Sequence, residues 1–120
     1  DMDFKKIYKE VIALYPKSID ISDGELLTET GGFKSSMLWS VYMDVEIKAG
    51  LLSEWHSLLG WVVYQVIHES ARENFQKNVY NVEFNLDPLK IHNFLNSNLE
   101  LEGYEDMREE YVNYIQSSGI

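Results

Sequence analysis

Histidine is the side chain that most often serves as a general base or metal ligand near neutral pH, so the three histidines are the first candidates for chemistry. His56 lies between Ser53 and Ser57, close to Glu54, a neighbourhood that offers a base and two hydroxyl nucleophiles. Adjacent residues on a helix do not face each other. We therefore interpret this group as compositional and expect His56 to lie near the surface at the start of a helix.

A second group contains His68, Glu69, Arg72 and Glu73. A metal site would use His68 with Glu69 and Glu73, but neighbouring helix positions differ by about 100° in direction. The sequence has neither a His-Glu-x-x-His nor a Glu-x-x-His motif. We expect an exposed Glu69–Arg72 ion pair instead. His92 has no acidic or metal-binding neighbour at helical spacing.

Other motifs for catalysis or metal binding fail on inspection. A twelve-residue calcium loop beginning at Asp20 would require Glu at its last position, where Gly31 stands. The chain has no cysteine, which excludes disulfides, cysteine zinc ligands and thiol catalysis. It has no phosphate-binding glycine loop and no Gly-x-Ser-x-Gly elbow. We therefore predict no enzymatic activity, no metal and no cofactor.

The strongest remaining signal is acidity. Acidic residues are concentrated within residues 100–110: Glu100, Glu102, Glu105, Asp106, Glu109 and Glu110. Acids in the first turn of a helix complement its dipole, which explains part of this cluster. The like charges of Glu105 and Glu109, four residues apart, repel each other and lack that explanation.

The overall charge of the chain indicates which kind of partner it would bind. The chain carries 20 acidic against 10 basic side chains, a net charge of −10, which argues against nucleic acid and anionic membranes. It favours a basic protein partner. We predict that the acids of residues 100–110 bind this partner, together with Tyr114, Asp20, Asp23 and Glu25.

The spacing of apolar residues predicts the elements that position these side chains. The predicted helices span residues 2–15, 51–76, 87–95 and 103–117. The predicted strands are two short strands within 18–29, joined by a turn at Asp23-Gly24, and strands at 37–48 and 80–86. The whole chain, residues 1–120, is then a single α+β domain. It has a small antiparallel or mixed sheet on a long central helix, with flanking N- and C-terminal helices.

Two of these elements are predicted to form the core. Residues 37–48 alternate apolar and polar side chains, which indicates a long strand with one buried face. Residues 51–76 are apolar on more than half of the helix surface, which indicates a central helix. We expect Gly60 to permit a close approach between elements, and Trp39, Trp55 and Trp61 to be mostly buried.

A small, acidic, motif-free domain is most often a binding protein. Our hypothesis is an immunity protein or antitoxin that covers the active site of a basic nuclease toxin with carboxylates. Bacterial contact-dependent inhibition and colicin systems use such proteins. The charged, helix-like first ten residues and the lack of cysteine favour a cytoplasmic location. The alternatives are a nucleic-acid mimic that inhibits a DNA-binding protein, and a small enzyme or ligand-binding domain.

Overall fold

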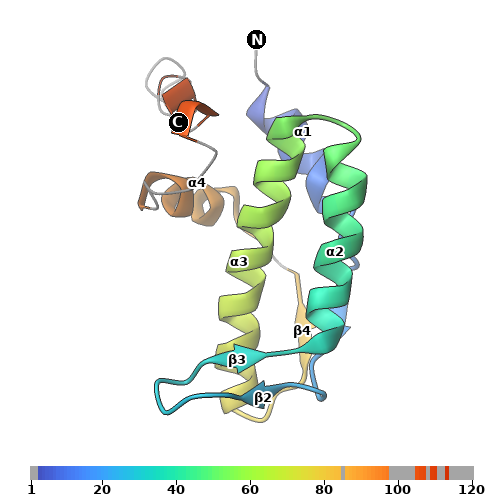
Figure 1. Ribbon diagram of the computed structural model, residues 1–120, viewed down its shortest axis with the longest axis vertical. Helices are drawn as coiled ribbons and strands as arrows, with labels where there is room; N and C mark the ends of the chain where they lie inside the picture. The colour runs from blue at the N-terminus through green and yellow to red at the C-terminus, as the bar shows by residue number, and fades with distance from the viewer. Residues whose placement is uncertain (1–2, 85, 98–104, 108, 111–112, 114–120) are drawn as a thin grey trace.

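The long helix α3 (Glu54–Gln76) is the element against which most others pack (Figure 1). The computed structural model describes residues 3–84, 86–97, 105–107, 109–110 and 113. The other helices are α1 (Phe4–Ile12), α2 (Ser36–Gly50) and α4 (Pro88–Ser97), and residues 105–107, 109–110 and 113 are also helical. The strands are β1 (Ser18–Asp20), β2 (Glu25–Leu26), β3 (Phe33–Lys34) and β4 (Asn81–Glu83). The predicted α+β fold is therefore confirmed.

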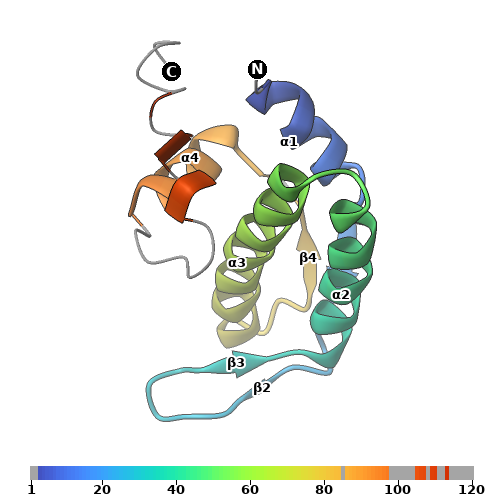
Figure 2. The ribbon, with the colours of Figure 1, turned by 45° about the horizontal axis from the view of Figure 1, so that its top comes forward.

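The strands form two antiparallel pairs rather than one sheet. β1 pairs with β4, with Ile19 opposite Val82, and β2 pairs with β3, with Leu26 opposite Phe33. The Asp23-Gly24 turn therefore leads from one sheet to the other instead of closing a hairpin. The β2–β3 arm crosses the end of α3 that lies farthest from α1, as Figures 1 and 2 both show.

The prediction of a long strand over residues 37–48 is wrong, because this segment forms helix α2. The buried side chains recur at helical spacing: Leu38, Tyr42, Val45 and Ala49. Ser35 caps the helix by accepting a hydrogen bond from the Leu38 backbone N–H at 3.2 Å. The alternating pattern arose because apolar residues lie both on the buried face of this helix and on its outer face.

The core is the contact of α3 with α2 on one side and with α1 and α4 on others. Fully buried side chains along α3 are Leu58, Leu59, Val62 and Val63. The Tyr15 hydroxyl donates a hydrogen bond of 2.7 Å to the Gly60 carbonyl, and burial raises the pKa of that hydroxyl. This bond ties the segment after α1 to the middle of α3.

The helix ends follow the sequence signals. The Asp3 carboxylate accepts a hydrogen bond of 3.2 Å from the Lys6 N–H at the start of α1. The Asp87 carboxylate accepts one of 2.9 Å from the Leu89 N–H at the start of α4. Each of these side chains satisfies an N–H that the first helical turn leaves without a partner.

The expected burial of the tryptophans holds only in part. Trp55 and Trp61 are partly buried and pack against the core, whereas 52% of Trp39 is exposed. Trp39 lies on the flank of α2, with one side of its ring toward Tyr64 of α3 and the rest exposed. Its burial was expected from the strand assignment, which is wrong.

The expectation for Gly60 can be tested by substitution. A Cβ on Gly60 would lie 3.6 Å from Val45 and 3.7 Å from Ala49, ordinary van der Waals distances, so α2 leaves room for a methyl group. Gly60→Ala should therefore raise the free energy of unfolding by up to about 1 kcal/mol through helix propensity. Urea unfolding measures this. Gly50→Ala, in open space on α2, is the control. A loss of stability in Gly60→Ala alone would show that α2 lies too close to Gly60 to leave room for a methyl group.

Candidate functional site

The predicted partner-binding acids of the C-terminal segment are only partly within the described residues. Glu105, Asp106, Glu109 and Glu110 lie on helical residues and are exposed. Glu100, Glu102 and Tyr114 lie outside the described residues. Exposure is all that the structure establishes for these four side chains, and their contact with a partner protein stays a prediction.

Asp23 has a structural role that the sequence did not suggest. Its carboxylate accepts hydrogen bonds from the Ser35 hydroxyl at 2.9 Å, from the Met37 N–H at 3.0 Å and from the Ser36 hydroxyl. The bond from Ser36, with those from Met37 and Ser35, holds the pKa of this carboxyl below its usual value. Asp23 therefore fixes the turn after β1 to the first turn of α2.

The other two predicted acids of this region are exposed. The Asp20 carboxylate accepts a hydrogen bond of 2.8 Å from the Ser22 N–H and so stabilises the turn, while Glu25 lies on β2. The fold places Asp20, Asp23 and Glu25 on the same segment of chain.

His56 is buried, with 8% of the residue exposed, so the expectation of a surface histidine is wrong. The Ser53 hydroxyl lies 2.6 Å from Nδ1 of His56 and accepts a hydrogen bond of 3.2 Å from its backbone N–H. Nε2 lies 3.7 Å from a carboxylate oxygen of Glu10 on α1. The sequence could not show this group, because Glu10 comes from a distant element.

Serine, histidine and glutamate are also the residue types of a hydrolase triad, but the geometry here is that of a helix cap. The Ser53 hydroxyl caps α3 by accepting a hydrogen bond from the His56 backbone N–H. The Glu10 distance exceeds a hydrogen bond, and Nε2 has no hydrogen-bond partner within the described chain. We assign the group to the junction of α1 and α3 rather than to catalysis.

The second histidine group is also structural. Nε2 of His68 lies 2.9 Å from the Phe33 carbonyl oxygen and so joins β3 to α3. The expected Glu69–Arg72 ion pair is not formed, because the Arg72 guanidinium reaches toward the loop at Gly31. Within the described ranges, no group of three or more histidine, aspartate or glutamate side chains could hold a metal ion.

A row of large, exposed apolar side chains follows α2 and ends at Leu51, the residue just after the helix. We call it the α2 outer row: Trp39, Met43, Ile47 and Leu51. Their exposed fractions are 52%, 38%, 65% and 83%. Residues four apart follow one another along a helix face, so the row extends about 18 Å. A contiguous exposed apolar surface of this kind marks an interaction site more often than a scatter of single residues does.

The α2 outer row is held in place by neighbouring rings and bordered by charges. The Trp39 ring lies 5.5 Å from Tyr42 and 6.0 Å from Tyr64, and those two tyrosines stack at 4.2 Å. Along the border, Lys48 forms an exposed ion pair of 2.8 Å with Asp44, whereas Glu46 forms no ion pair with any residue that the structure describes. Ordered aromatic anchors with a polar border are the usual anatomy of a protein interface.

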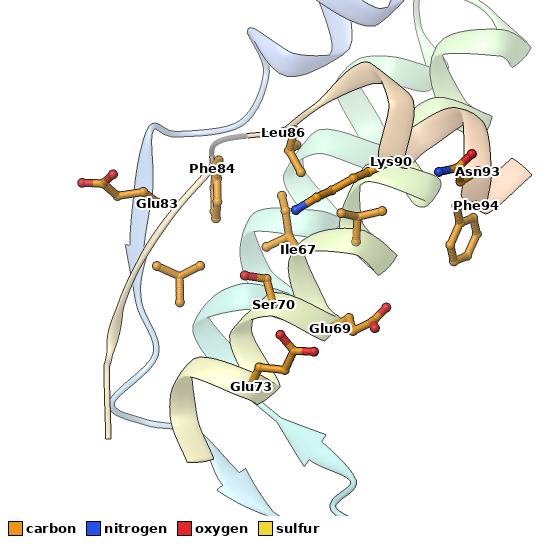
Figure 3. A pocket seen from close by; sticks show the side chains of 12 residues that line it. Ile67, Glu69, Ser70, Glu73, Glu83, Phe84, Leu86, Lys90, Asn93 and Phe94 are labelled. Carbon is orange, nitrogen blue, oxygen red and sulfur yellow. The ribbon is translucent and has the colours of Figure 1, made fainter. Parts of the chain in front are cut away.

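A second surface feature is a groove of about 480 Å³ between α3, β4 and α4, which we call the α3–α4 groove (Figure 3). Ile67, Phe84 and Phe94 contribute apolar lining, and Glu69 and Glu73 contribute carboxylates. The volume lies within the range of ordinary ligand sites. No local sequence pattern indicates this groove, because its walls come from three separate elements.

Comparisons with known proteins do not identify the chain: no protein family, curated protein or solved structure matches it. Among the described residues, no helix is both long enough and apolar enough to cross a membrane.

The role of Asp23 predicts a pH-dependent loss of stability. Asp23→Ala should lower the free energy of unfolding by about 1 to 2 kcal/mol at pH 7, because the hydrogen bonds to Ser35, Ser36 and Met37 are lost. A carboxyl whose pKa is lowered by folding stabilises above its unfolded pKa of about 3.9, and this contribution disappears as the pH falls through the folded pKa. The difference in the free energy of unfolding between wild type and Asp23→Ala should therefore become smaller at acidic pH.

Urea unfolding at pH 7 and at pH 3 measures this difference. Glu25→Ala is the matched control, because Glu25 is exposed and nearby and should change stability by no more than about 0.5 kcal/mol. A difference that is the same at both pH values would contradict a role for the charged carboxylate.

Proposed function

We propose that this domain binds a basic protein and neutralises it, as an immunity protein or antitoxin does. The observation that carries the proposal is the α2 outer row, which exposes Trp39 and Ile47 to solvent on a single acidic domain. Large apolar side chains in the middle of an interface supply most of its binding energy. This row is the natural centre of the contact.

The charge of the chain supports a basic partner over a second copy of itself. Each chain carries a net charge of −10, so two copies repel each other while a cationic protein is attracted. The exposed acids at Glu105, Asp106, Glu109 and Glu110 add to this field. In this proposal they steer the partner toward the domain, and the α2 outer row holds it.

Ile47→Lys should abolish neutralisation. The substitution places a cation in the α2 outer row opposite a basic partner, and loss of a central anchor weakens binding by about 2 kcal/mol or more. The tagged chain is used to capture proteins from a lysate of the source organism. A captured basic protein is then expressed alone and with each variant, and cell growth is measured.

Leu89→Lys is the matched control, since Leu89 is an exposed leucine on α4 that lies outside the α2 outer row. The proposal expects growth to be rescued by wild type and by Leu89→Lys but not by Ile47→Lys. Equal rescue by both variants would place the contact elsewhere, and a captured protein that is not toxic would remove the neutralising role.

The exposed acids should affect the speed of binding more than its lifetime. Charges are screened within about 10 Å at 0.1 M salt, so the association rate should fall steeply as salt is raised while dissociation changes less. Glu109→Lys combined with Glu110→Lys should slow association at low salt. Surface-immobilised kinetics at several salt concentrations measures both rates. Unchanged rates at low salt would show that these acids are only a solvated surface.

A further inference from the structure

Strand β4 uses one of its two edges for β1. The Tyr80 carbonyl oxygen, just before β4, accepts a hydrogen bond of 2.7 Å from the Ile21 N–H. The Phe84 N–H, just after β4, donates one of 3.0 Å to the Lys17 carbonyl. These two bonds show that the even-numbered residues from 80 to 84 direct their backbone groups toward β1.

The residues between them direct their backbone groups the other way. In an antiparallel pair, hydrogen-bonded and non-hydrogen-bonded positions alternate. Asn81 and Glu83 lie opposite Asp20 and Ser18 at the non-hydrogen-bonded positions. Their N–H and C=O groups therefore point away from β1, and no hydrogen bond from the described part of the chain reaches them.

This free edge runs along the α3–α4 groove. Val82, Glu83 and Phe84 all line the groove, and Figure 3 shows β4 passing along one side of it with α3 opposite. Alternate side chains of a strand point to the same face, so a strand added beside β4 would direct every second side chain into the groove. The next such side chain would follow about 7 Å further along.

The groove changes character along its length. Figure 3 shows the carboxylates of Glu69 and Glu73 toward one end and Leu86 and Lys90 toward the other. Both glutamates are exposed, and neither forms an ion pair within the described residues. Because they lie four residues apart on α3, their like charges repel each other, and a cation placed between them would relieve that repulsion.

We propose that the α3–α4 groove and the free edge of β4 together bind an extended basic segment of a protein partner by strand addition. Backbone hydrogen bonds to Asn81 and Glu83 hold the segment, as in other strand-addition sites. One inward side chain is arginine or lysine, facing Glu69 and Glu73. Apolar side chains at the following alternate positions pack on Val66 and Phe84, which line the groove and are only partly buried.

This inference does not depend on the role proposed for the α2 outer row, because the groove uses different elements. A small organic cation would also suit the carboxylates and the apolar lining. It would leave the four backbone groups of Asn81 and Glu83 without partners, whereas an extended peptide satisfies them. Whether the backbone amides of Asn81 and Glu83 become hydrogen-bonded therefore distinguishes an extended peptide from a small cation.

The probe is a panel of seven-residue peptides with blocked ends. In the parent peptide, arginine, valine and leucine alternate with threonine, so the three face the groove together. Two further members replace arginine with glutamate, or valine and leucine with serine. A fourth carries N-methyl groups on the threonines and so cannot donate their backbone hydrogen bonds.

Binding is followed by NMR of the ¹⁵N-labelled full chain. The parent peptide should shift the amide signals of Asn81 and Glu83 and slow their hydrogen exchange, while Val82, already bonded to β1, changes little. Glu69→Lys combined with Glu73→Lys should weaken binding at least about tenfold. The double variant Glu25→Lys and Glu46→Lys has the same change in charge away from the groove and should bind like wild type. Ile47→Lys should also bind normally.

Three results would overturn the proposal. One is that no member of the panel changes the amides of Asn81 and Glu83 at millimolar concentration. Another is that the N-methylated peptide binds as tightly as the parent, which would leave the groove a pocket for side chains or small cations. The third is equal affinity for the arginine and glutamate peptides, which would remove the role of Glu69 and Glu73.

Discussion

The packing of α2 against α3 is the contact on which the other features of this domain depend. Val45 and Ala49 of α2 lie over Gly60 of α3, and this contact fixes the rotation of α2 about its own axis. Once that rotation is set, Ile47 must face solvent, because it lies on the opposite side of the same helix. Trp39 then lies on the flank of α2, half exposed, with its ring against Tyr64 of α3. The Ser35 cap, held by the Asp23 carboxylate, fixes where α2 begins and so where the β2–β3 arm joins this helix. The exposed row is thus a consequence of the core.

The fold class was predictable from the sequence because most elements carry local signals. Asp3 and Asp87 mark two helix starts. The apolar periodicity of residues 51–76 is strong enough to predict a helix despite the low helix propensity of Gly60. The strand prediction for residues 37–48 was wrong for a physical reason. A helix with apolar side chains on both its buried and its exposed face produces an alternating pattern, which is also the pattern of a strand. The serine at position 35, three residues before buried Leu38, was the local signal that favoured a helix.

The candidate sites were much less predictable, because each combines distant parts of the chain. The acidity that suggested a basic partner can be read from the amino-acid composition without knowledge of the fold. His56, however, is buried by the approach of α1, and no local pattern foretells its neighbour Glu10. The groove depends on how α4 lies beside α3 and β4, and the free edge of β4 depends on β1 pairing with only one side. Pairing partners of strands this short are set by tertiary packing rather than by their own residues.

Helices α2 and α4 lie on opposite sides of α3, as Figures 1 and 2 show. The α2 outer row is carried by the first of these helices, and the α3–α4 groove is lined in part by the second. A compact partner that covers one of them cannot reach the other directly. A partner with a folded body and an extended basic segment could reach both, and the second contact would then be intramolecular. Such linkage raises the overall affinity without further contacts, provided that the connecting chain can span the domain. The short β4 edge offers few hydrogen bonds, so binding there alone should be weak. Its contribution would become large only for a segment already held close by the contact on α2.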